Sequence, residues 1–231
     1  EVLAREVCHR KDGLSPGRLV GHLASWAMHL ELASDFAAAD LLNAYFDADT
    51  AGGGGFMTNE DFRWQGKRHR YELLRLLLEE AGCGARRCDV VEVGVFAAET
   101  SAHLLQQLPL LHLHGVDPYS AAVEHPSAGS AMHDLARRRY ATFGPRATLH
   151  RNTSAEVAPK FGPVDLVFVD GSHLYEGVAA DLTAWGAKAR RMAGHDLNLL
   201  HGGVARAVHE WAAGRRVHLL PDGIWFVDVL R

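Results

Sequence analysis

The fold of this chain is decided by residues 164–182, VDLVFVDGSHLYEGVAADL. The stretch starts with an apolar run, which is typical of a strand buried on both faces of a parallel sheet. Polar residues follow at once, with Asp170 and His173 three positions apart, and the remainder has helical spacing. A buried strand that ends in a carboxylate and an imidazole indicates a functional site at that strand end.

The same alternation of strand and helix extends in both directions from this stretch. Strands are predicted for DVVEVGV (89–95), LHLHGVD (111–117), ATLHR (147–151) and RRMAG (190–194). Apolar strands separated by helices predict a parallel sheet covered on both faces. The tail RVHLLPDGIWFVDVL (216–230) differs, because two strand-like runs flank the turn Pro221-Asp222-Gly223. This pattern predicts a closing antiparallel hairpin at the edge of the sheet.

The N-terminal part of the chain has a different character. Two helices are predicted in residues 16–48, since apolar residues there recur at helical spacing. The four glycines at 52–55 predict a mobile loop, and a third helix is expected at about 67–81. We therefore expect a helical cap or lid over residues 1–65 and an α/β domain over residues 66–231.

Composition limits the partners. The 24 Lys and Arg residues against 28 Asp and Glu residues give a net charge of -4, which disfavours nucleic acid as a partner. No apolar segment approaches the roughly 20 residues needed to cross a bilayer, so no membrane partner is expected. A small-molecule partner is expected instead, and a homo-oligomeric state is left open.

The three cysteines Cys8, Cys83 and Cys88 are odd in number and lack CxxC spacing. This pattern favours reduced thiols and an intracellular, cytoplasmic protein. The chain begins at Glu1 without a methionine, so a removed targeting peptide is left open.

Polar residues also follow the first predicted strand, which ends in Glu92 and Gly94. The glycine allows a tight turn and close approach of a ligand to the backbone. Glu99, Thr100 and Ser101 then open a helix, whose N-terminus is a favourable place for a polar ligand group. Because ligands of open α/β sheets bind beyond the carboxyl ends of the strands, these residues are candidate ligand contacts.

The second strand ends at Asp117, near the spacing at which a carboxylate accepts the hydroxyls of a ribose. Neither GxxxxGK[ST] nor GxGxxG occurs at the first loop, so the chain lacks the usual cradle for a diphosphate. A nucleoside without a diphosphate is the expected ligand. A nicotinamide-dependent oxidoreductase is disfavoured for the same reason.

A family resemblance covers residues 66–231 and is most specific in FVDGSHLYEGVAADLTAW and GHD. The other matching segments are VVEVGVFAAETSAHLL, LHGVDPY, NTSAEV, GVARAVHEW and DGIWFVDV. These segments resemble the class I S-adenosylmethionine-dependent methyltransferases, and within them the small O-methyltransferases related to macrocin-type sugar enzymes. The resemblance implies a Rossmann-like, doubly wound, mainly parallel seven-stranded sheet. It also implies methyl transfer to a hydroxyl of a small molecule, either a sugar or a phenol.

The resemblance further implies where S-adenosylmethionine binds. Glu92 and Gly94 would contact its methionine end, Asp117 its ribose, and the loop 152–154 would lie near its adenine. Ala98 stands where the family usually has a second glycine, which we interpret as tighter packing rather than lost binding. The full set of expected cofactor contacts is Glu92, Gly94, Glu99, Thr100, Ser101, Asp117, Asn152, Thr153, Ser154 and Asp170.

Members of the similar family hold Mg²⁺ on acidic residues at two strand ends, and the resemblance places these ligands at Asp170 and Asp196. His173 matches a histidine that acts as general base. His195 stands where an oxygen ligand is more usual, and imidazole suits Zn²⁺, Mn²⁺ or iron better than Mg²⁺. We expect a divalent metal, Mg²⁺ by the resemblance, and whether His195 is a ligand stays open.

Two other interpretations stay open. Asp170 and Asp196 are also suited to capping strand-to-helix turns, and a nucleoside-binding protein without catalysis would carry the same fold. The 15 histidines are scattered along the chain, and we expect His201, His209 and His218 to have no functional role.

Overall fold

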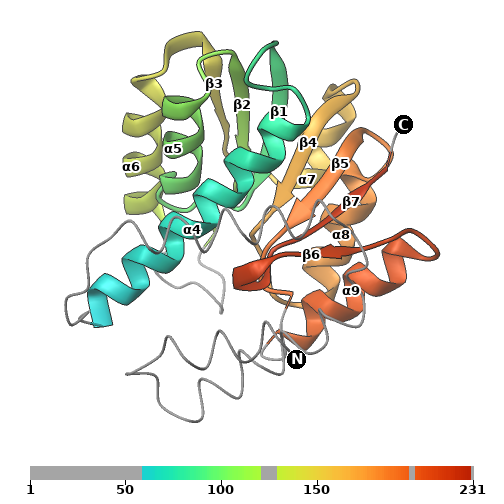
Figure 1. The fold of residues 1–231 in the computed structure, drawn as a ribbon. Helices are drawn as coiled ribbons and strands as arrows, with labels where there is room; N and C mark the ends of the chain where they lie inside the picture. The colour runs from blue at the N-terminus through green and yellow to red at the C-terminus, as the bar shows by residue number, and fades with distance from the viewer. Residues whose placement is uncertain (1–58, 121–128, 198–200, 230–231) are drawn as a thin grey trace, which may run out of the picture.

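The computed structural model describes residues 59–120, 129–197 and 201–229. These residues form a seven-stranded sheet with helices on both faces (Figure 1). The predicted helices of residues 16–48 and the glycine run lie outside the described residues. The strands are β1 Cys88–Val93, β2 Leu111–Val116, β3 Ala147–His150, β4 Val164–Val169, β5 Ala189–Gly194, β6 His218–Leu219 and β7 Trp225–Asp228.

The strand order is β3-β2-β1-β4-β5-β7-β6. The first five strands of that order pair in parallel, whereas β7 is antiparallel to both β5 and β6. The chain turns from β6 to β7 through a short 3-10 segment, η3 (Pro221–Gly223), in which Asp222 has φ 64. The predicted parallel sheet with an antiparallel C-terminal hairpin is thus confirmed.

The described helices divide between the two faces of the sheet (Figure 1). Alternate residues of each strand face opposite layers, so that Val90 packs in the core under one layer and Val91 in the core under the other. Burial on both faces explains why the strands read as near-continuous apolar runs. One layer holds α4 (Asn59–Glu80), α5 (Glu99–Gln107) and α6 (Ser130–Ala141), and the other holds α7 (Ser154–Val157), α8 (Tyr175–Trp185) and α9 (Gly202–Ala212).

Helix α4 corresponds to the helix predicted at 67–81. It ends at Glu80, close to the predicted end, and Gly82 follows with φ 86, which suits glycine. It begins earlier than predicted, at Asn59. The division into residues 1–65 and 66–231 stays a prediction, since residues 1–58 lie outside the described part.

Cys83 and Cys88 form a disulfide, so the expectation of reduced thiols is wrong for this pair. The turn after α4 brings their Cα atoms to 5.3 Å, within the range that a disulfide spans. The spacing of five residues is not a recognised motif, which is why the pairing could not be predicted from the sequence. Cys8 lies outside the described residues.

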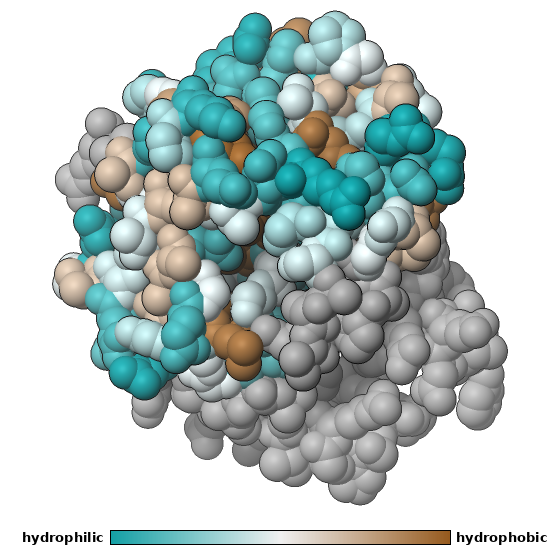
Figure 2. Space-filling model, turned by 180° about the vertical axis from the view of Figure 1, so that it is seen from behind, coloured by the Kyte–Doolittle hydropathy of each residue, from teal (hydrophilic) through white to brown (hydrophobic). Residues whose placement is uncertain are grey.

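The face of the molecule in Figure 2 is mainly hydrophilic where residues are described, and hydrophobic residues show only as small separate patches. The large hydrophobic side chains that are exposed are Phe96, Leu110 and Leu174. Among the described helices, none is long and apolar enough to cross a bilayer.

Candidate active site

The ends of β1 and β4 touch at Gly94. This residue has φ 87, and a Cβ atom there would clash with the backbone carbonyl of Asp170. The amide of Asp170 donates a 2.8 Å hydrogen bond to the carbonyl of Val93, which fixes the two strand ends side by side. The loop expected to hold the methionine end of the cofactor therefore lies beside the predicted metal ligand Asp170.

The turn after β1 has a left-handed backbone at two non-glycine residues, Phe96 (φ 48) and Ala98 (φ 63). Ala98 directly precedes α5, and its methyl group is fully buried in the core under α4 and α5. The methyl group therefore packs inward, which agrees with its interpretation as tighter packing.

Glu92 is buried at the end of β1, with 3% of its surface exposed. Its carboxylate accepts a hydrogen bond from the Ser101 hydroxyl, which lies 2.7 Å from the Tyr140 hydroxyl. Burial raises the pKa of Glu92 to about 8, although hydrogen bonds from Ser101 and Thr100 act in the opposite direction. The structure thus brings the predicted residues Glu92, Thr100 and Ser101 together. Their contact with a cofactor stays a prediction.

Asp117 fixes the loop after β1. One carboxylate oxygen accepts hydrogen bonds of 3.0 Å from the backbone amides of Val95 and Phe96, and the other accepts one of 2.7 Å from the amide of Tyr119. These bonds leave lone pairs for further acceptance, because a carboxylate has about four acceptor positions. The side chain lies at the loop where a ribose would bind, and it also shapes that loop.

Two other sets of predicted cofactor residues have partners of their own. Glu99 accepts a 3.2 Å hydrogen bond from the Tyr71 hydroxyl of α4. Thr153 caps α7 in a capping box with Glu156, whose carboxylate also lies 3.4 Å from the Asn152 amide nitrogen. Ser154 is buried and accepts a 3.1 Å hydrogen bond from the indole of Trp185. The structure does not bring residues 152–154 into the polar site at the end of β4.

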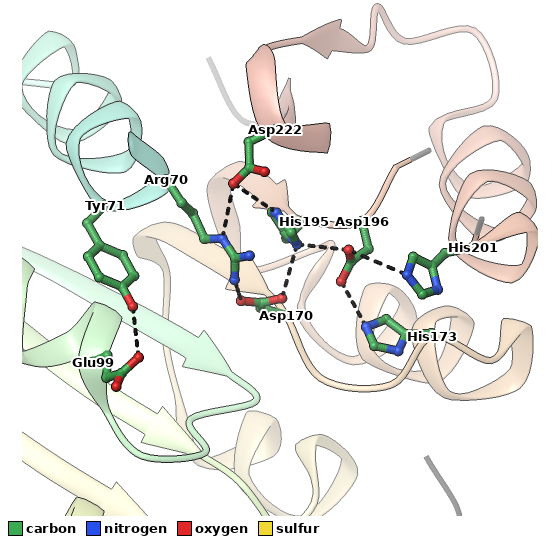
Figure 3. A network of polar contacts seen from close by, with 9 residues as sticks. All are labelled: Arg70, Tyr71, Glu99, Asp170, His173, His195, Asp196, His201 and Asp222. Atoms are coloured by element: carbon green, nitrogen blue, oxygen red, sulfur yellow. Dashed lines mark hydrogen bonds and ion pairs between the residues drawn. The ribbon is translucent and has the colours of Figure 1, made fainter. Parts of the chain in front are cut away.

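The parallel pairing of β4 with β5 brings the other predicted residues together. Val169 pairs with Gly194, so Asp170 and His195 follow on adjacent strand ends. His173 Nε2 lies 2.8 Å from Asp196 Oδ2. Figure 3 shows these four side chains converging at the ends of β4 and β5. The structure thus brings these four predicted residues together, and their roles as metal ligands and base stay predictions.

Three residues of this cluster were not predicted. Arg70 of α4 donates a 2.8 Å hydrogen bond to Asp170 and lies 3.6 Å from Asp222, which itself lies 3.4 Å from His195 Nε2. His201 Nε2 lies 3.7 Å from Asp196 Oδ1, and its ring stacks on that of His173. His201, for which no functional role was expected, therefore lies in contact with this cluster. Asp222 was recognised only as a turn residue, and no local pattern marks Arg70.

The charges of the cluster alter the protonation of its members. Burial lowers the pKa of His195, but contacts with Asp196 and Asp222 outweigh it and raise the value to about 9. Burial raises the pKa of Asp170, against the effect of Arg70. For Asp196, burial is outweighed by His173 and His195, which lower its pKa. In this state His195 is an imidazolium between carboxylates.

The donor set formed by Asp170, His195 and Asp196 fits a divalent cation. Its three ligand atoms lie within 4.8 Å of one another. His195 Nδ1 is buried, lies 3.1 Å from Asp196 and 3.6 Å from Asp170, and has no aligned hydrogen bond. Arg70 donates its hydrogen bond to Oδ2 of Asp170, so Oδ1 of Asp170 faces His195. A cation would displace the proton of His195, because a ligating imidazole must be neutral.

Residues 91–197 match a family model described as a methyltransferase domain. No curated protein matches the chain at a significant level.

Solved structures with a similar fold include three described as O-methyltransferases. The enzyme TomG of Streptomyces achromogenes, involved in tomaymycin synthesis and solved in complex with SAM, is 17% identical with a TM-score of 0.51, over 94% of this chain and 100% of that one. The Bacillus cereus enzyme, solved with SAH, is 16% identical with a TM-score of 0.50, over 85% and 92%. A putative caffeoyl-CoA O-methyltransferase of Staphylococcus aureus is 11% identical with a TM-score of 0.54, over 92% and 100%.

At these identities the similarity of the structures shows a shared fold. The family-model match runs from Val91, within β1, to Leu197, after β5, which is less than half of the chain; it includes Glu92, Gly94, Asp117, Asp170 and Asp196. Residues 91–197 are thus similar to a methyltransferase domain, and the described part of the chain has the fold of the O-methyltransferases named above.

Proposed function

We propose that this protein transfers a methyl group from S-adenosylmethionine to a hydroxyl of a small molecule, a sugar or a phenol, with the help of a divalent cation. The observation that carries the proposal is the buried His195 Nδ1, which faces both Asp170 and Asp196 without an aligned hydrogen bond. A metal ion at this position would replace the proton of His195 and be held by the imidazole and both carboxylates.

The charge of the cluster supports a divalent cation. Asp170, Asp196 and Asp222 carry three negative charges, and Arg70 neutralises one of them. A divalent ion balances the two remaining negative charges once His195 has lost its proton. Such an ion would be held by Asp170, His195 and Asp196. Arg70 would hold Asp170 in place, and Asp222 would contact the Nε2 atom of His195 on the other side of the ring.

The contact between Gly94 and Asp170 supports methyl transfer at this place. Gly94 belongs to the expected methionine-binding loop, and its missing side chain lets the end of β4 approach. Bound S-adenosylmethionine supplies an electrophilic methyl group, and a bound divalent ion supplies Lewis acidity that lowers the pKa of an acceptor hydroxyl. On this proposal the methyl donor and the ion would lie next to each other, and orientation would contribute much of the rate.

His173 is the candidate base. Its Nε2 lies 2.8 Å from Asp196 Oδ2, which orients the ring, and the side chain is 24% exposed. It can therefore reach a hydroxyl held at the strand ends, take its proton as the oxygen attacks the methyl carbon, and pass the proton to solvent.

A direct test is turnover with sugar and phenolic acceptors after removal of metal by a chelator. We expect methylated product, detected by mass spectrometry, only after Mg²⁺ or Mn²⁺ is restored. S-adenosylmethionine binding measured by calorimetry should persist without metal, since all of its expected contacts except Asp170 follow β1, β2 and β3. Full activity in excess EDTA would exclude the metal-dependent mechanism.

Binding without catalysis is the second candidate, and one observation favours it. The guanidinium of Arg70 already neutralises Asp170, so it could stand in for a cation in a site that binds but does not react. Tight binding of S-adenosylmethionine, with no product from either acceptor class under any metal, would support this function.

A further inference from the structure

A second donor set lies beside the predicted metal ligands. His173, Asp196 and His201 place their ligand atoms within 4.8 Å of one another. His173 Nε2 is 2.8 Å from one Asp196 oxygen, and His201 Nε2 is 3.7 Å from the other. The two imidazole rings are stacked, with centroids 4.2 Å apart (Figure 3). Asp196 is shared with the set that contains Asp170 and His195.

The fold builds this proximity through Gly203. His201 directly precedes α9, and Gly203 is two residues further along. A Cβ atom at Gly203 would lie 2.5 Å from the carbonyl oxygen of His173 and 2.8 Å from the amide nitrogen of Tyr175. Glycine thus allows the start of α9 to pack directly against the segment after β4, which brings His201 to His173.

The two donor sets differ in their neighbours. Arg70 contacts Asp170 and Asp222, and its charge acts against a second cation near Asp170. The side chains of His173, Asp196 and His201 are 24%, 17% and 31% exposed, so an ion can reach them from solvent.

We propose that His173, Asp196 and His201 form a site for a divalent transition metal such as Zn²⁺, separate from the Mg²⁺ site proposed at Asp170. Two imidazoles and one carboxylate suit Zn²⁺, Co²⁺ or Ni²⁺, whereas Mg²⁺ prefers oxygen ligands. A bound metal ion accepts the lone pairs of both stacked rings and balances the charge of Asp196.

The site has a consequence that rests on the proposed function. If His173 is the base, its Nε2–H is donated to Asp196 and its Nδ1 takes the acceptor proton. A metal ion on Nε2 leaves the ring proton on Nδ1, so no ring lone pair remains for the acceptor proton. Zn²⁺ bound there would stop methyl transfer although S-adenosylmethionine remains bound. The protein would thus be inhibited by Zn²⁺ at a site that includes His201.

The test uses the full chain after chelator treatment, with Zn²⁺ alone in calorimetry and Co²⁺ alone in absorption spectroscopy. His201→Ala should weaken Zn²⁺ binding by at least about tenfold and change the Co²⁺ spectrum, because one of three ligands is lost. His201→Gln repeats the test with a side chain of similar size. His209→Ala is the matched control, because His209 is an exposed histidine of the same helix, and it should change Zn²⁺ affinity less than about twofold.

Unchanged Zn²⁺ affinity in a folded His201→Ala or His201→Gln variant would overturn the site. So would loss of Zn²⁺ binding in Asp170→Asn together with full binding in His201→Ala, since the metal would then lie at the other set. Calorimetry and the Co²⁺ spectrum need no turnover. Zn²⁺ binding that depends on His201 in a protein without methyltransferase activity would therefore support the site and reject only the proposed function.

Discussion

The ends of β1 and β2 and the ends of β4 and β5 both carry buried or half-buried carboxylates, but these have different partners. Asp117 and Glu92 accept hydrogen bonds from backbone amides and hydroxyls of their own neighbourhood. Asp170 and Asp196 instead contact Arg70 and histidines. The carboxylates at the first pair of strand ends are held by neutral hydrogen-bond donors. Those at the second pair form ion pairs, in which a metal ion can take the place of a proton.

Asp196→Ala should have the largest effect if the second pair of strand ends carries the chemistry. We expect it to abolish turnover while S-adenosylmethionine still binds, because Asp196 contacts His173 and His195 but no residue of the β1 loop. Asp196 has φ 58, so alanine would also strain the backbone. Asp196→Asn tolerates this φ and should also lose turnover. Normal activity in the asparagine variant would contradict the assignment.

His173→Ala separates the base from the metal. Turnover should fall by roughly 10²–10⁴, the usual contribution of a positioned proton acceptor. Mg²⁺ affinity in calorimetry should change little, because Asp170, His195 and Asp196 remain. The acidic limb of the pH–rate profile should also disappear. A variant that retains this limb would exclude His173 as the base.

Asp117→Ala tests the first pair of strand ends. We expect S-adenosylmethionine affinity to fall by about 1–3 kcal/mol, because the ribose hydroxyls lose a charged acceptor and the amides of Val95 and Phe96 lose theirs. Calorimetry measures the loss. Metal affinity should stay the same, and a loss of metal binding would show that the two pairs of strand ends are not independent.

A different kind of effect concerns Glu92 and the stability of the protein without ligands. Its pKa is raised from 4.5 to about 8 in the folded state, so the folded protein binds one more proton than the unfolded chain between these values. The stabilising contribution of this group is present below about pH 4.5 and is lost as pH rises toward 8. Glu92→Gln should remove this component of the pH dependence in urea unfolding. An identical pH dependence in the variant would contradict the raised pKa.

The sequence predicts the sheet well because its strands are buried on both faces and read as apolar runs between helices. It also indicates Asp170 and His173, which are neighbours along the chain, and His195 with Asp196, whose strand lies next to theirs. Arg70 could not be found in this way, since it meets Asp170 across 100 positions through the packing of α4. The position of His201 beside His173 likewise depends on how α9 packs against the segment after β4.

Other predictions concerned residues whose partners are set by local geometry. Thr153 and Ser154 follow β3 as predicted, but Thr153 caps α7 and Ser154 is held by Trp185. The disulfide between Cys83 and Cys88 depends on the turn that follows α4. The spacing of Thr153 and Glu156 is that of a capping box, so the cap of α7 could have been predicted from the sequence.

The position of β7 has a consequence for the synthesis of the protein. Trp225 of β7 pairs with Gly194, the residue before His195, and its indole lies where a side chain at Gly194 would be. β7 is the last of the seven strands to leave the ribosome, yet it lies between β5 and β6. Until it is made, β5 is an open edge that can pair with other chains. The end of the sheet that carries the predicted metal ligands is therefore complete only once β7 has been made, and a nascent chain is exposed to misassembly at β5 until then.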